Sequence, residues 1–68
     1  MCSLKIMVNG QPQETGARNL AELCAALGYG DAKIATAVNG DFVPAASRAE
    51  TALAREDRVE IVAPRQGG

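Results

Sequence analysis

The chain has no histidine and no tryptophan, and its 68 residues include only one tyrosine, one phenylalanine and two cysteines. The absence of histidine removes the commonest general base and the commonest metal ligand together. Two cysteines far apart in the sequence make neither a zinc cluster nor the four-thiolate set of an iron-sulfur centre. Two aromatic residues are too few for a surface on which nucleic-acid bases stack. Most enzyme and metal-binding functions are therefore excluded.

The chain also lacks a large excess of either positive or negative charge, and it lacks long apolar runs. Seven basic and eight acidic residues give a formal net charge of −1, which argues against a surface that follows a phosphate backbone. The apolar runs span only a few residues, whereas a membrane helix needs about 20. A secreted disulfide scaffold of this size would carry more cysteines. We therefore expect a soluble cytoplasmic protein that binds no nucleic acid, membrane or cofactor.

Two Asn-Gly dipeptides mark the strands. Leu4–Val8 is rich in apolar residues and precedes Asn9-Gly10, a dipeptide that favours tight hairpin turns. Gln11–Thr15 is polar and contains Pro12, which suits an edge strand. Residues 34–38 and a brief strand from Asp41 surround the second dipeptide, Asn39-Gly40. We expect two hairpins.

One segment between the hairpins has helical periodicity. Its apolar residues recur at the spacing of a single helical face, namely Leu20, Leu23, Cys24 and Leu27. Asn19 is the expected N-cap, with Glu22 three residues later, and Gly28 or Gly30 supplies a left-handed exit. Residues 45–54 lack a clear period and are expected to form a loop with one helical turn. Arg58–Val62 alternates in character and predicts a last strand.

The order of these elements predicts the fold class. A single amphipathic helix must bury its apolar side against one face of a sheet. We therefore predict an α+β protein with a β-grasp (ubiquitin-like) fold, in which a mixed four- to five-stranded sheet packs on one main helix. Residues 1–63 form the domain, and residues 64–68 form a flexible C-terminal tail that ends in Gly67-Gly68.

The domain offers no recognisable catalytic group. Cys24 lies on the apolar helical face and is interpreted as a small buried hydrophobe rather than a reactive thiol. Neither serine, Ser3 or Ser47, has a base at a recognisable spacing, so no nucleophilic triad can be built. The carboxylates are interpreted as a solvated rim: Glu50, Glu56, Asp57 and Glu60. We predict that the chain is not an enzyme.

The end of the chain is its most unusual feature. Six residues follow the last strand, and at about 3.3 Å each they reach roughly 20 Å beyond the domain. Because glycine has no Cβ, Gly67-Gly68 can pass through a narrow channel and deliver a carboxylate to a buried site. A carboxylate is a poor electrophile until it is activated, for example by joining it to AMP. An ATP-using partner enzyme would supply that step.

Several segments together resemble a known family. They are the run Ala37–Pro44, the run Asp57–Val62 and the terminal Gly67-Gly68, placed after a hairpin and a helix. In this combination, over essentially its whole length, the chain resembles the ThiS family of ubiquitin-like sulfur carriers in thiamine biosynthesis. Two departures stand out. The family often has glycine where this chain has Glu56, and its tail is commonly small or apolar where this chain has Pro64-Arg65-Gln66.

The resemblance implies a mechanism and a set of partners. An adenylyltransferase of the ThiF type would adenylate Gly68, and a cysteine desulfurase or other sulfurtransferase would replace AMP with sulfur to give a thiocarboxylate. Thiazole synthase (ThiG) would then accept the sulfur. Gly68 carries over as the modified residue, and Gly67, Gln66 and Arg65 as the segment that threads into the partner.

A docking surface can be predicted from strand parity. If Val59 and Ile61 face the helix, Glu60 and Val62 face outward. By the same reasoning Met7 lies on the outer side of the first strand. We expect Met7 and Val62 to form an exposed patch beside the tail that anchors the activating enzyme.

Other readings of the Gly-Gly end stay open. The small subunit of molybdopterin synthase and carriers for other sulfur pathways share the fold and the thiocarboxylate. From a different class, the chain could be a ubiquitin-like modifier joined to lysines of other proteins through Gly68, or an interaction module with an inert tail. Intact mass separates these readings, because they predict sulfur gain, large conjugates and no change, respectively.

Overall fold

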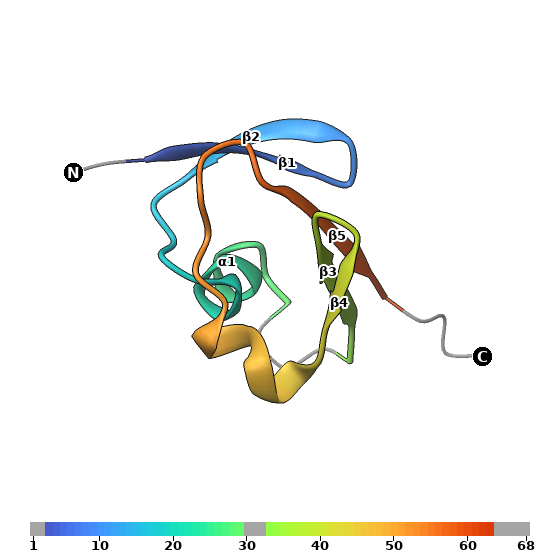
Figure 1. The fold of residues 1–68 in the computed structure, drawn as a ribbon. Coiled ribbons are helices and arrows are strands. Elements are labelled where there is room, and N and C mark those ends of the chain that lie inside the picture. The colour runs from blue at the N-terminus through green and yellow to red at the C-terminus, as the bar shows by residue number, and fades with distance from the viewer. Residues whose placement is uncertain (1–2, 30–32, 64–68) are drawn as a thin grey trace.

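A computed structural model describes residues 3–29 and 33–63 of the chain (Figure 1). Strand, helix and turn assignments follow the expected order closely. The elements are β1 (Leu4–Val8), β2 (Gln11–Thr15), α1 (Leu20–Ala26), β3 (Ala35–Val38), β4 (Asp41–Val43), the 3₁₀ helix η1 (Ala45–Glu50) and β5 (Arg58–Val62). The bounds of β1, β2 and β5 are those predicted from the sequence, and β3 begins one residue later than predicted.

The strands form one mixed sheet in the order β2-β1-β5-β3-β4. The last strand, β5, lies in the centre, where it pairs parallel with β1 and antiparallel with β3. The two predicted hairpins, β1-β2 and β3-β4, lie on either side of it. Figure 1 shows α1 on one side of this sheet. The predicted α+β, β-grasp layout is confirmed, with five strands among the described residues.

Both hairpin turns have the geometry that Asn-Gly favours. Asn9 and Gly10 have φ values of 52° and 82°, and Asn39 and Gly40 have values of 54° and 86°. A type I′ turn requires positive φ at both central residues, and asparagine and glycine tolerate this region best. The local sequence therefore determines both turns.

The helix begins and ends at the predicted signals. The Asn19 side-chain oxygen accepts a hydrogen bond from the Glu22 backbone N–H at 2.8 Å, which satisfies one of the free donors of the first turn. The Glu22 carboxylate accepts from the backbone N–H of Arg18 at 2.9 Å, and this bond, helped by the Arg18 charge, lowers the pKa of Glu22. Gly28, with φ at 92°, turns the chain out of the helix. Gly30 lies outside the described residues.

The core lies between α1 and the inner face of the sheet. The helix contributes Leu20, Leu23 and Cys24, all at most 4% exposed. Facing and flanking them are Ile6, Val8, Val43, Leu53, Val59 and Ile61. Full burial of one such aliphatic side chain stabilises the fold by about 1.5–3 kcal/mol. The predicted helical face is therefore the buried one.

The 3₁₀ helix η1 is longer than the single helical turn expected for this stretch. Arg48 holds it against β3, because its guanidinium donates to the Thr36 hydroxyl at 3.1 Å and to the Ile34 carbonyl oxygen at 2.6 Å. The Thr36 hydroxyl donates in turn to the Val43 carbonyl oxygen at 2.8 Å. Thr36 is 1% exposed, and a buried hydroxyl without partners would be costly. Contacts with β3 and α1, rather than local periodicity, therefore fix this segment.

The departure at Glu56 generates a stability prediction. Glu56 has φ at 69° in the turn before β5, a conformation that costs a residue with a Cβ about 1–2 kcal/mol and glycine little. Glycine loses about 0.5–1 kcal/mol through its greater freedom in the unfolded chain. We expect Glu56→Gly to raise the free energy of unfolding by about 0.5–1 kcal/mol, measured as a higher urea midpoint at an unchanged m value.

Glu50→Gly is the matched control. Glu50 is exposed at the end of η1, where backbone φ is negative and the glycine brings only its entropic cost. This variant should lose roughly 0.5–1 kcal/mol. If both variants lose stability alike, the left-handed backbone at Glu56 is not a source of strain.

Candidate functional site

The described part of the chain contains no metal or nucleophilic centre. No group of three cysteine or acidic side chains within residues 3–29 and 33–63 is placed to hold a metal ion. Cys24 is 4% exposed, and burial raises the pKa of its thiol, more than the Arg48 charge lowers it. A buried, protonated thiol is a poor nucleophile. Its interpretation as a core residue is confirmed, and Cys2 lies outside the described residues.

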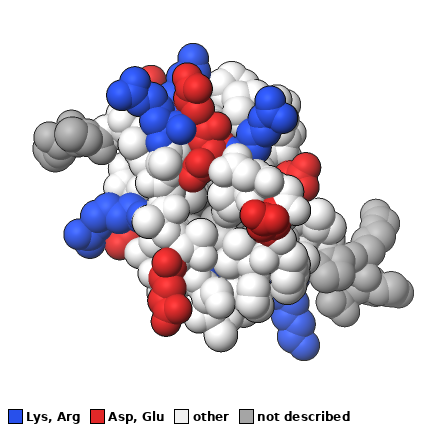
Figure 2. Space-filling model, in the orientation of Figure 1, with Lys and Arg blue, Asp and Glu red and all other residues white. Residues whose placement is uncertain are grey.

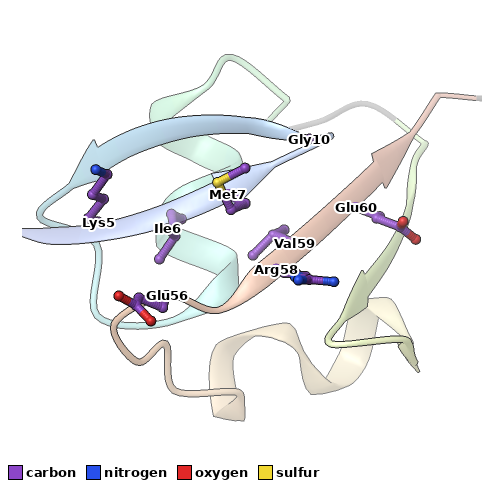
Figure 3. Close-up of a pocket in the computed structure, with 8 residues that line it drawn as sticks. All are labelled: Lys5, Ile6, Met7, Gly10, Glu56, Arg58, Val59 and Glu60. Carbon is purple, nitrogen blue, oxygen red and sulfur yellow. The ribbon is translucent and has the colours of Figure 1, made fainter.

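An open hollow between β1 and β5 is lined by a mixture of charged and apolar residues (Figure 3). It has a volume of about 540 Å³. Lys5 and Arg58 bring positive charge to it, and Glu56 and Glu60 bring an equal negative charge. Its other lining residues are Ile6, Met7, Gly10 and Val59. None of these eight lining residues forms a nucleophile–base pair of the kind used in covalent catalysis.

Charged side chains do not gather by sign on the face shown in Figure 2. Lysine and arginine side chains alternate there with aspartate and glutamate, with uncharged surface between them. This distribution agrees with the formal net charge of −1. A polyanion such as nucleic acid requires a basic stripe or patch, and this face provides none. Among the described residues, none of the helices has the length and apolar character needed to cross a membrane.

The inner and outer sides of β5 are those predicted from parity. Val59 and Ile61 are 1% and 5% exposed, whereas Val62 is 60% exposed. Glu60 is exposed as well. Val62 is the last residue of β5, so an apolar side chain stands on the outer face just before the C-terminal segment. This placement gives Val62 the exposure that a docking residue needs.

Met7 is placed less favourably than Val62. It lies on the outer side of β1, as predicted, but is only half-exposed. Its register partners are Pro12 on β2 and Arg58 on β5. Because Val62 is four residues beyond Arg58, strand rise places it about 13 Å further along the sheet than Met7. The two residues share a face but do not form the contiguous patch that the sequence suggested.

Sequence reasoning missed Phe42, which is 69% exposed on β4. Phe42 pairs with Ala37 on β3, and the next outward residue of β3, Ala35, pairs with Val62. We call these four residues, Ala35, Ala37, Phe42 and Val62, the outer-face patch. The signal was present in the sequence, since Val43 faces the core and strand alternation then turns the preceding aromatic residue outward.

The tail residues predicted to act lie outside the described residues. They are Arg65, Gln66, Gly67 and Gly68. Ala63 is the last residue whose placement is described, and it directly follows β5. The structure therefore defines the strand from which the C-terminal segment begins, which is the central strand of the sheet.

The comparisons with known proteins agree with this geometry. The model of the ThiS family matches residues 6–68. A crystal structure of a thiamine biosynthesis protein (ThiS) from Geobacter metallireducens is similar, with a TM-score of 0.79 and 29% sequence identity. The similarity covers 96% of this chain and 100% of that one. No curated protein matches the chain. The family match, together with the similar ThiS structure, shows that the chain belongs to the ThiS family of sulfur carriers, which are carrier proteins rather than enzymes.

Proposed function

We propose that the chain carries sulfur as a thiocarboxylate on the C-terminus of Gly68 and delivers it to thiazole synthase in thiamine biosynthesis. The observation that carries the proposal is the family match, which extends through the final Gly67-Gly68. The domain supports it, because the exposed apolar surface lies beside the start of the C-terminal segment. We take residues 1–63 as the folded carrier domain and residues 64–68 as the segment that enters partners.

The chemistry proceeds in three steps, each catalysed by a partner. A ThiF-type enzyme joins the Gly68 carboxylate to the α-phosphate of ATP and releases pyrophosphate. The persulfide of a cysteine desulfurase or another sulfurtransferase attacks the adenylate and releases AMP, which gives an acyl disulfide. A second thiol then reduces its S–S bond, which leaves the thiocarboxylate and a disulfide on the sulfur donor. ThiG then takes the sulfur, and the carboxylate is regenerated. Gly68 is the only residue of this chain whose bonds change.

The segment before Gly68 has a positioning task. Gly67 has no side chain, so the backbone beside the reacting carbonyl can approach a buried nucleotide site closely. Gln66 and Arg65 precede it and supply polar contacts along the entry path. Arg65 carries a guanidinium, which can bind a carboxylate through two parallel hydrogen bonds.

We place partner docking on the outer-face patch. Phe42 and Val62 are the exposed large hydrophobic residues of the described chain, and the two alanines between them carry only methyl groups. At protein interfaces a few anchor side chains contribute most of the binding energy. The patch ends at Val62, directly before the C-terminal segment, so a partner bound there is well placed to receive the tail. Met7 is a peripheral contact in this arrangement.

The carrier chemistry predicts a change in mass that depends on Gly68. After incubation with ATP, a cognate ThiF-type enzyme and a sulfur source, intact mass spectrometry should show the exchange of one oxygen for sulfur. A variant that lacks Gly68 should show none, because its terminal carboxylate falls one residue short of the activating site. Gly67→Val should also fail, since it keeps the carboxylate but adds a side chain in the narrow passage.

The other outcomes assign other functions. If an enzyme proven active on another carrier gives neither adenylate nor sulfur with the wild type, the chain is an interaction module. Conjugates of higher mass would indicate a protein modifier. Sulfur that passes to a pterin precursor but not to thiazole synthase would indicate the molybdopterin pathway.

The docking proposal predicts that a charge in the outer-face patch weakens partner binding. Phe42→Asp and Val62→Asp should each raise the Kd for the ThiF-type enzyme roughly tenfold or more, as loss of an interface anchor does. Both side chains are mostly exposed, so the fold should be retained. Titration calorimetry measures the Kd, and circular dichroism checks the fold.

Ala26→Asp serves as the control for an added charge. Ala26 is an exposed residue at the end of α1, away from the outer face of the sheet. Its substitution should leave the Kd within about twofold, the usual range for residues outside an interface. Equal affinities for the wild type, Phe42→Asp and Val62→Asp would show that the patch is not the docking surface.

A further inference from the structure

The end of β5 is held on its β1 side by a side chain rather than by a strand. The last register pair between β1 and β5 is Val8 with Val59, after which β1 turns away at Asn9. Ile61 lies two residues beyond Val59 on β5, and its N–H donates a hydrogen bond to the Asn9 side-chain oxygen at 2.8 Å. The Asn9 side-chain nitrogen donates to the Ile61 carbonyl oxygen at 3.2 Å.

The alternation of hydrogen bonds explains why Ile61 needs this partner. In a central strand, the backbone groups of successive residues point alternately to the two neighbouring strands. The Asn39 N–H donates to the Arg58 carbonyl oxygen at 2.7 Å, so Arg58 bonds toward β3. The next residue, Val59, therefore bonds toward β1. The Val59 carbonyl oxygen accepts from the Asn9 N–H at 2.9 Å, on the β1 side. Ile61 has the same direction, but β1 has ended before reaching it. The Asn9 amide supplies the donor and the acceptor that a further strand residue would have supplied.

On this geometry we infer that Asn9 is a positioning residue for the C-terminal segment. Asn9 fixes Ile61, which lies two residues before Ala63, and residues 64–68 follow directly. The inference rests on the proposed function, in which the segment must deliver Gly68 to a defined point in the activating enzyme. Without the Asn9 amide, the β1 side of Ile61 is released and the segment starts from a spread of positions.

The effect should appear in kcat more than in KM. Docking depends on the outer-face patch, whereas Asn9 contacts the β1-facing edge of β5 and is not part of that patch. Loosening β5 therefore leaves most of the binding surface intact but lowers the fraction of bound carriers whose carboxylate is in place. Misplacement of a reacting group by about 1 Å can reduce a rate by as much as 10²-fold.

The second Asn-Gly turn provides a matched control. Asn39 has nearly the same φ as Asn9 and also bonds to β5 through its side chain. Its side-chain oxygen accepts from the Arg58 N–H at 3.0 Å, and its nitrogen donates to the Asp57 carboxylate at 3.1 Å. These contacts hold the beginning of β5, the end away from the C-terminal segment. Asn39→Gly therefore removes two comparable hydrogen bonds without releasing Ile61.

The experiment compares Asn9→Gly, Asn9→Asp and Asn39→Gly with the wild type. Glycine accepts the positive φ of each turn, so the hairpins should form in both glycine variants. Asn9→Asp keeps an oxygen acceptor for the Ile61 N–H but loses the donor to the Ile61 carbonyl oxygen. Steady-state ATP-pyrophosphate exchange with a cognate ThiF-type enzyme gives kcat and the KM for the carrier. Amide hydrogen exchange of Ile61 and ¹⁵N relaxation of Val62 and Ala63 report on the end of β5 without any enzyme.

We expect Asn9→Gly to lower kcat roughly tenfold while KM changes by less than about threefold. Exchange of the Ile61 amide should accelerate roughly fivefold, as expected for loss of one hydrogen bond, and order parameters at Val62 and Ala63 should fall. Asn9→Asp should fall between Asn9→Gly and the wild type. Asn39→Gly should keep the wild-type kcat and the wild-type order parameters at these two residues.

Three results would overturn the inference. The first is equal kcat values for Asn9→Gly and Asn39→Gly when both variants are folded. The second is an effect of Asn9→Gly on KM alone, and the third is unchanged relaxation at Val62 and Ala63 in Asn9→Gly. A wild-type chain that is never adenylated would instead refute the proposed function, and the relaxation measurement would still decide whether Asn9 positions the end of β5.

Discussion

The pairing of β5 with both β1 and β3 is the constraint on which the rest of this structure depends. The two hairpins do not pair with each other, and the sheet is continuous only because β5 lies between them. β5 also buries Val59 and Ile61 against the helix layer. Because β5 follows the other described strands in the sequence, the core cannot close until residues 58–62 are in place. The same strand leads into the C-terminal segment, so an element paired on both sides determines where that segment begins.

The inner face of the sheet contributes to the stability of the fold, and the outer face offers an exposed surface for recognition. The inner face and α1 make a small core, in which Thr36 is the one buried polar residue among those described; its hydroxyl is satisfied by the Val43 carbonyl oxygen and Arg48. No helix within residues 3–29 and 33–63 covers the outer face, where Phe42 and Val62 are exposed. A domain of this size has little apolar surface to spare, because only about 60% of its unfolded surface is buried on folding. Exposed hydrophobic residues in so small a protein are best explained by a partner.

Features with a local cause could be predicted from the sequence, and features that depend on register could not. The Asn-Gly turns, the Asn19 cap and the alternation in β5 each arise within a few residues, and the structure confirms them. The extent of η1 was missed because Arg48 holds it against β3 through hydrogen bonds to residues 12 and 14 positions earlier in the sequence. The separation of Met7 from Val62 follows from the β1-β5 register, which no local pattern reveals. Strand alternation could have placed Phe42 outward, but its position beside Ala37 and near Val62 depends on the pairing of β3 with β4 and β5.

A carrier of this kind needs a reactive group outside its folded domain and a defined origin for it. The five residues after Ala63 span at most about 17 Å, so the Gly68 carboxylate is confined to a sphere of that radius around the end of β5. In the proposed function the catalytic groups belong to partners, so the domain does not shape the chemistry within this sphere. We propose that it instead sets the centre of the sphere, through the Asn9 and β3 contacts with β5, and the orientation of the carrier on a partner, through the outer-face patch. Precision at the origin of the tail therefore takes the place of an active site.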